Sequence, residues 1–145
     1  MKNKKFNRKM INAKYINWYI SLNSSAEMQE LRLFPNVKEV QETLSIYYNI
    51  FDKISLLDTN IKRDNNRIAT FSFGDGVSPR LAGFLSFMTK WTNYSIDPLM
   101  REEEYNGKIQ RCFCYKDKAE SFVQNLSTYG FVGTEIRKNL LIFEY

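Results

Sequence analysis

Residues 67–98 constrain the fold of this chain more than any other segment. Residues 68–73 (IATFSF) are rich in strand-forming side chains and end at the glycine turn Gly74-Asp75-Gly76. Apolar residues at helical spacing follow within residues 78–91, and residues 92–96 again have the pattern of a strand, which ends at Asp97. Strand, glycine turn, helix and strand in this order predict two parallel strands joined by a crossover helix.

The start of the predicted helix carries signals of its own. Ser78 has a hydroxyl suited to the N-cap, and Pro79 fits the first helical position, where its missing N–H is not needed. The free N–H groups of the first helical turn favour an anion, and Arg80 adds a positive charge beside them. Gly83, one turn later, allows the helix to pack closely on its neighbours.

The rest of the chain extends this alternation. Residues 16–22 form either a short strand or a helix, residues 24–33 predict a short helix, and Asn36 with Glu39 predicts a capped helix over 37–54. Further on, we expect one helical turn within 100–107, a strand at 108–115, a helix at 119–129 and a last strand at 140–145. Asp117 is the expected cap of the 119–129 helix and Gly130 its stop, with a short apolar segment at 131–132.

Four strands separated by helices favour an α/β fold, namely a small three-layer, Rossmann-like half. The expected sheet is mostly parallel, has the order 3-2-1-4, and is preceded by N-terminal helices. The alternative is an α+β, ferredoxin-like arrangement built on the last part of the chain. The 145 residues fit one domain, which we expect at 16–145, after a basic N-terminal arm at 1–15.

The charge of the chain is concentrated in that arm. Residues 1–26 contain no acid and carry six of the 21 basic residues, which leaves 15 basic and 16 acidic residues for the remainder. Such an arm favours RNA, a larger protein complex or an anionic membrane surface as its partner; a solvated tail is the alternative. The candidate nucleic-acid contacts are Lys2, Lys4, Lys5, Arg8 and Lys9.

Cysteine and histidine usage limits the possible chemistry. The chain has no histidine, and its two cysteines, Cys112 and Cys114, fall on one face of a predicted strand. Two ligands do not make a zinc site, so we expect no metal and interpret both cysteines as core residues of a protein in a reducing, intracellular compartment. The apolar runs are too short for a membrane span.

The glycine turn and the spaced acid resemble a nucleotide-binding fingerprint. Gly74-x-Gly76-x-x-Pro79 follows Gly-x-Gly-x-x-Gly except at its third position, and Asp97 lies 21 residues beyond Gly76, where the fingerprint has an acid. Over residues 68–97, and by pattern only over 108–145, the chain resembles class I S-adenosylmethionine-dependent methyltransferases. In that family the first strand usually ends in an acid, whereas this chain has Ser72 there and Asp75 between the glycines.

The resemblance implies a Rossmann-like protein that binds a nucleotide-type ligand such as S-adenosylmethionine, with methyl transfer as its chemistry if it is an enzyme. No general base is evident from the sequence, and the catalytic residues are unknown. The candidate cofactor-binding residues are Gly74, Asp75, Gly76, Ser78, Arg80 and Asp97. Three of them also have a structural interpretation: Asp75 satisfies the turn, Arg80 pairs with Asp97 or Asp75, and Asp97 ends a strand.

Two other functional hypotheses stand beside this one. The chain is a non-catalytic subunit that binds RNA or a large assembly and keeps a vestigial cofactor site, or it is a viral or mobile-element protein that sequesters a nucleotide or inhibits a host factor. A carboxyl end of the sheet filled by the protein's own side chains, such as Arg80 or Trp18, favours the non-catalytic subunit.

Overall fold

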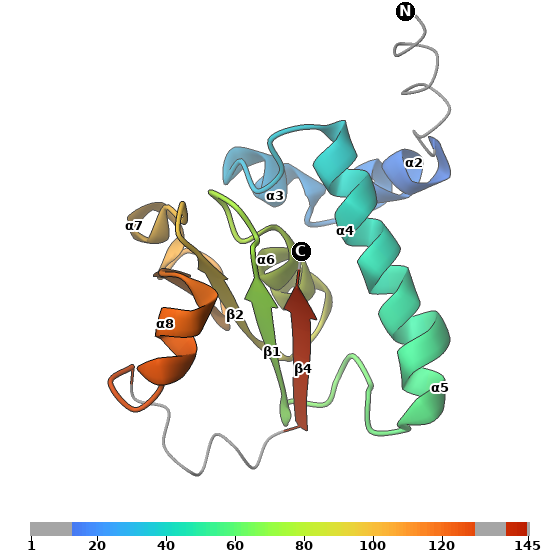
Figure 1. The fold of residues 1–145 in the computed structure, drawn as a ribbon. Helices are drawn as coiled ribbons and strands as arrows, with labels where there is room; N and C mark the ends of the chain where they lie inside the picture. The colour runs from blue at the N-terminus through green and yellow to red at the C-terminus, as the bar shows by residue number, and fades with distance from the viewer. Residues whose placement is uncertain (1–12, 130–138, 145) are drawn as a thin grey trace, which may run out of the picture.

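The computed structural model describes residues 13–129 and 139–144 (Figure 1). The N-terminal elements are α2 (Ala13–Ser21), α3 (Ser25–Glu30), α4 (Val37–Asn49), the π-helical segment η1 (Ile50–Ile54) and α5 (Ser55–Leu57). The alternating part consists of β1 (Ile68–Phe73), α6 (Arg80–Met88), β2 (Thr92–Asp97), α7 (Glu102–Tyr105), β3 (Cys112–Lys116), α8 (Ala119–Gln124) and β4 (Asn139–Glu144). The five arm residues, Gly130 and the 131–132 segment lie outside the described residues.

The four strands form one parallel sheet with the order β3-β2-β1-β4. β1 pairs in parallel with both β2 and β4, and β2 pairs in parallel with β3. The predicted order and direction are therefore confirmed. The ferredoxin-like alternative is wrong, because that arrangement needs antiparallel neighbours.

The helices cover the two faces of the sheet unequally. α6 packs on one face, with α2 and α4 beyond it, whereas α8 lies on the other (Figure 1). The larger hydrophobic core, here called the first core, lies between these helices and the sheet. Alternate strand residues such as Ile68, Cys112 and Cys114 are buried in it. Both cysteines are free and buried there, as predicted. No helix among the described residues has the length and apolar character needed to cross a membrane.

The opposite face of the sheet has a smaller, aromatic core. Ala69, Tyr94, Ile96 and Phe122 are buried in it, and Phe122 comes from α8. Tyr94 stacks on Phe71, with ring centroids 4.9 Å apart, and on Phe113, at 5.5 Å. Because these rings stack on one another, they present their edges rather than their faces away from the sheet.

Several element boundaries differ from the expectation. Residues 37–54 are helical, and the Asn36 side chain caps this helix by accepting the N–H of Glu39 at 3.0 Å. The last turn, however, is a π-helix. β3 begins at Cys112 rather than residue 108, because Arg111 has a left-handed φ of 59° that interrupts an extended chain. Of the strand and the helix that were the alternatives for residues 16–22, the helix is correct, since most of this segment lies within α2.

The helix after β3 is also shorter and capped differently than predicted. α8 ends at Gln124, and Asn125 leaves the helical conformation while its side chain bonds the carbonyl of Ser121 at 2.8 Å. Asp117 is not the N-cap. Its carboxylate accepts from the Tyr129 hydroxyl at 2.7 Å and from the N–H of Lys118.

Gly83 lets α6 approach the loop before α4, as its position in the sequence suggested. A Cβ at Gly83 would lie 2.7 Å from Cδ1 of Leu33, whose side chain is fully buried. That separation is shorter than real Cβ contacts, so a side chain at residue 83 would force the buried Leu33 side chain to shift.

We therefore expect Gly83→Val to lower the free energy of unfolding by about 1–3 kcal/mol, because the added carbons overpack the Leu33 contact. Leu33→Ala removes the opposing atoms, so the double variant should lose less stability than the two single losses added together. Urea unfolding of the four proteins measures this, and strictly additive losses would contradict the contact.

Candidate functional site

The β1–α6 turn, at the carboxyl end of the sheet, depends on two left-handed glycines. Gly74 has a φ of 85° and Gly76 a φ of 94°, conformations that side-chain-bearing residues rarely adopt. The N–H of Gly74 donates to the carbonyl of Ile96 at 2.9 Å, which fixes the end of β1 against β2. The glycines thus direct Asp75 into the protein between them.

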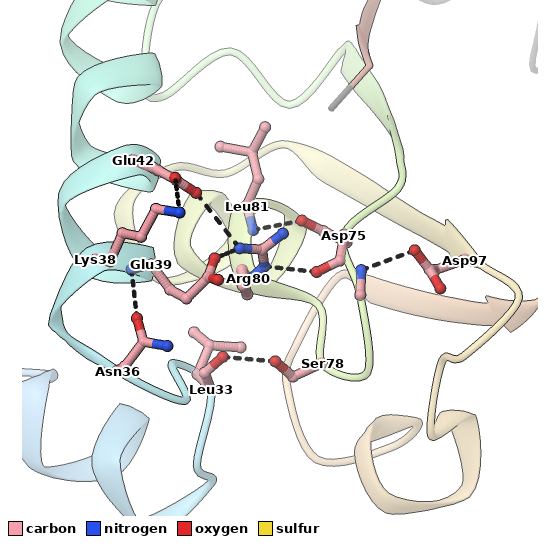
Figure 2. Close-up of polar contacts among 11 residues, drawn as sticks. Leu33, Asn36, Lys38, Glu39, Glu42, Asp75, Ser78, Arg80, Leu81 and Asp97 are labelled. Carbon is pink, nitrogen blue, oxygen red and sulfur yellow. Dashed lines mark hydrogen bonds and ion pairs between the residues drawn. The ribbon is translucent and has the colours of Figure 1, made fainter. Parts of the chain in front are cut away.

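The carboxylate of Asp75 occupies the N-terminus of α6. Asp75 is completely buried and accepts the N–H of Leu81 at 3.0 Å (Figure 2). It also accepts the N–H of Ala82 at 3.4 Å and the Ser95 hydroxyl at 2.6 Å. The sequence reasoning expected free N–H groups at this point. That expectation is wrong, because the protein's own carboxylate provides the anion that a helix N-terminus favours.

Asp75 also replaces the predicted cap. The Ser78 hydroxyl donates to the carbonyl of Leu33 at 2.7 Å, and α6 begins at Arg80, after a non-helical Pro79. Ser78 is therefore not the helix cap. It joins the turn to the chain before α4 instead, because its side chain is directed toward that segment (Figure 2).

Arg80 is held on both sides of its guanidinium. Its Nε donates to the backbone carbonyl of Asp75 at 2.6 Å, and its Nη1 forms ion pairs with Glu39 and, at 3.8 Å, Glu42 of α4 (Figure 2). Its side chain is only 11% exposed. The acids it pairs with are thus on α4, rather than Asp75 or Asp97 as the structural interpretation had suggested, because α4 lies beside the start of α6.

Asp97 lies where the spacing in the sequence placed it, next to Gly76. Its Oδ2 accepts the N–H of Gly76 at 2.9 Å, and its Oδ1 accepts the N–H of Leu99 at 2.7 Å. The residue is 8% exposed. Both carboxylate oxygens therefore hold backbone loops together at the end of β2.

All six candidate residues belong to the same turn region, and their polar groups are engaged by the protein itself. Among the described residues, no three acidic or cysteine side chains gather closely enough to hold a metal ion.

A hydrogen bond with Cys114, together with burial, raises the pKa of the Cys112 thiol, which keeps it protonated.

The amino ends of the strands carry a group of basic residues that sequence reasoning did not single out. Arg67 immediately precedes β1, Lys90 lies two residues before β2, and Arg111 immediately precedes β3. Lys90 donates its N–H to the carbonyl of Arg63 at 2.7 Å, which places the exposed Lys62 and Arg63 beside them. The signal was readable in the sequence as a basic residue directly before or near each strand.

The two ends of the sheet therefore differ in charge. At the carboxyl end, Asp75 and Asp117 follow β1 and β3, and Asp97 is the last residue of β2. At the amino end, Lys62, Arg63, Arg67 and Lys90 are exposed, while Arg111 donates to the carbonyls of Ser86 and Thr89. The exposed basic side chains are thus at the amino end, opposite the end where parallel α/β folds bind nucleotides.

Comparison of the chain with protein-family models, curated proteins and solved structures found no match.

Burial of Asp75 gives the first test of this site. Burial, opposed by the hydrogen bonds from Ser95, Leu81 and Ala82, raises its pKa from 3.8 to about 6. A raised pKa means that the folded state holds the proton more tightly, so the stability from this group is complete below pH 3.8 and is lost as the pH rises through about 6. A shift of this size corresponds to about 3 kcal/mol.

We expect the Asp75→Asn variant to lose that pH dependence, because asparagine keeps an acceptor for the Leu81 N–H but does not titrate. Between about pH 4 and about pH 7, the free energy of unfolding of the wild type should fall by about 3 kcal/mol relative to the variant. Chemical unfolding at a series of pH values measures the difference. Parallel profiles would show that Asp75 titrates normally.

Proposed function

We propose that this chain is a non-catalytic RNA-binding protein whose Rossmann-like half serves as a scaffold. The observation that carries the proposal is the buried Asp75 carboxylate on the N–H groups of Leu81 and Ala82, at the position where a related fold receives a phosphate. The basic residues at the amino end of the sheet and in the N-terminal arm provide the RNA contacts.

Electrostatics argues against an anionic ligand at the carboxyl end. A phosphate at the start of α6 would lie beside the carboxylate of Asp75, and the nearest cation, Arg80, is already paired with Glu39 and Glu42. Ribose hydroxyls would have to compete with Gly76 N–H and Leu99 N–H for Asp97. If a ligand displaced one of these internal hydrogen-bond partners, a buried polar group would be left unpaired, which typically costs about 1–3 kcal/mol.

The basic residues at the amino end suit a phosphate backbone better than a single small anion. Lys62, Arg63 and Arg67 come from the loop before β1 and Lys90 from the loop before β2; all four are exposed, so they present charge along the edge of two neighbouring strands. On the second sheet face, Tyr94 stacks between Phe71 and Phe113, so its ring faces are not open to a base. We therefore expect contacts to phosphates, little sequence preference, and strong salt dependence.

Binding of single-stranded RNA at increasing salt tests this proposal. Replacing Lys62, Arg67 and Lys90 by glutamine should weaken binding and reduce the slope of log affinity against log salt by about 0.7 per lost contact. Deletion of residues 1–9, which removes Lys2, Lys4, Lys5, Arg8 and Lys9, should reduce the slope further. Fluorescence anisotropy with a labelled oligonucleotide provides the affinities.

The matched control is Lys38→Gln, which removes an exposed cation of α4 that is paired with Glu42. It should leave both affinity and slope unchanged. Equal losses in the control and in the triple variant would indicate a general charge effect, and an absence of RNA binding by the wild type would remove the proposal.

The competing candidate is a nucleotide-binding, methyltransferase-like protein. The 3-2-1-4 strand order and the contact of Gly76 with Asp97 at 2.9 Å favour it, since both belong to that type of site. Titration calorimetry with S-adenosylmethionine, S-adenosylhomocysteine, NAD and ATP separates the two candidates. We expect no heat of binding from any of the four, and saturable heat that Gly76→Val abolishes would establish the nucleotide site instead.

A further inference from the structure

α5 presents two consecutive leucines that the protein does not cover. Leu56 is 79% and Leu57 is 89% exposed, the highest values among the large apolar side chains of the described residues. None of the three residues of α5 is buried. Single exposed leucines are common on protein surfaces, but two adjacent ones at the end of a helix form a small apolar projection that contributes nothing to the core.

Aromatic packing beneath this projection holds it in a defined place. Phe51 of η1 stacks on Trp91 with ring centroids 5.6 Å apart, and the Arg63 guanidinium lies over the Phe51 ring at 4.3 Å. The indole N–H of Trp91 donates to the carbonyl of Lys62 at 2.7 Å. These contacts join η1 to the loops before β1 and β2, so the two leucines lie at the same end of the molecule as the amino ends of the strands (Figure 1).

Positive charge is in excess around the two leucines. Five exposed basic side chains lie in η1 and in the loops before β1 and β2, against three exposed acidic side chains in the same segments. The basic residues are Lys53, Lys62, Arg63, Arg67 and Lys90, and the acidic residues are Asp52, Asp58 and Asp64. An apolar projection within a region of net positive charge is complementary to a surface that is anionic outside and apolar beneath.

We infer that this end of the molecule binds the surface of an anionic phospholipid bilayer. In the bound state Leu56 and Leu57 enter the boundary between the headgroups and the acyl chains, while the flanking cations contact the lipid phosphates. A folded protein partner fits less well, because stable protein interfaces bury about 800 Å² on each side. Two leucines among eight charged residues do not provide an apolar patch of that size, whereas a bilayer requires no complementary pocket.

The bilayer uses the leucines, which RNA does not. RNA phosphates attract the cations but leave both apolar side chains in water. Lys62, Arg67 and Lys90 would contact either partner, so RNA and anionic vesicles should compete for the protein. The leucines therefore distinguish membrane binding from RNA binding, and the inference does not depend on the proposed RNA function.

Cosedimentation of the full chain with lipid vesicles tests the inference. We expect the wild type to bind vesicles of phosphatidylglycerol and phosphatidylcholine in equal parts, and to bind pure phosphatidylcholine much more weakly. Replacing Leu56 and Leu57 together by glutamine should lower the partition coefficient about tenfold or more, because the buried apolar area is lost. Lys53→Gln, which changes a cation outside the proposed RNA contacts, should lower it roughly fivefold.

The matched control is Leu99→Gln. Leu99 is also largely exposed, at 68%, but it follows β2 at the carboxyl end of the sheet. Its replacement should leave the partition coefficient unchanged. Tryptophan substitution gives a second readout: bromine-labelled acyl chains should quench the added fluorescence of Leu57→Trp and not that of Leu99→Trp.

The RNA affinity of the double leucine variant separates the two partners. An unchanged RNA affinity together with lost vesicle binding supports the inference. Lost RNA affinity with intact vesicle binding would assign the leucines to the RNA contact and overturn it, as would a wild type that does not bind the anionic vesicles or a Leu99→Gln variant that loses as much binding as the double variant. Circular dichroism confirms that each variant is folded.

Discussion

The buried carboxylate of Asp75 is the interaction on which the carboxyl end of the sheet depends. It joins the turn after β1 to the first N–H groups of α6 and to Ser95 of β2, and its backbone carbonyl binds Arg80. Arg80 in turn is paired with two acids of α4. One residue therefore connects two strands and two helices, and a buried acid of this kind is tolerated because several donors surround it.

The layer between the sheet and α6 continues this pattern. The Thr70 hydroxyl donates to the Asn93 side chain at 2.7 Å, and Asn93 donates to the Ser86 hydroxyl at 2.9 Å. These buried polar groups satisfy one another across β1, β2 and α6. Because a shift in register would leave them unpaired, the layer specifies how α6 is placed on the sheet as well as stabilising it.

This protein thus has the α/β architecture, but the polar groups at the position where such folds usually bind a ligand bond to other groups of the protein. The glycine turn, the helix start and the acid after the second strand are all present, yet each makes its bonds within the chain. Function is carried by the site and not by the architecture. We accordingly propose that RNA contacts lie at the basic amino end of the sheet.

The sequence by itself determined the parallel α/β fold, since the glycine turn, the Asn36 cap and the alternation of strand and helix patterns are local signals that led to the correct strand order. It also placed Asp97 beside Gly76, because the carboxyl ends of neighbouring parallel strands meet at one edge. Local signals failed where two groups competed for one partner. Ser78 was an adequate cap by position, but Asp75 reached the same N–H groups.

Only the tertiary structure decided which candidate groups were free. Arg80 of α6 forms an ion pair with Glu39 of α4, and the two residues are 41 positions apart in the sequence. No local pattern predicts such a pairing, because it depends on where α4 is packed. The exposure of Leu140 and Ile142 could not be predicted either, since four consecutive apolar residues in a strand give the same pattern whether one or both faces of the strand are covered.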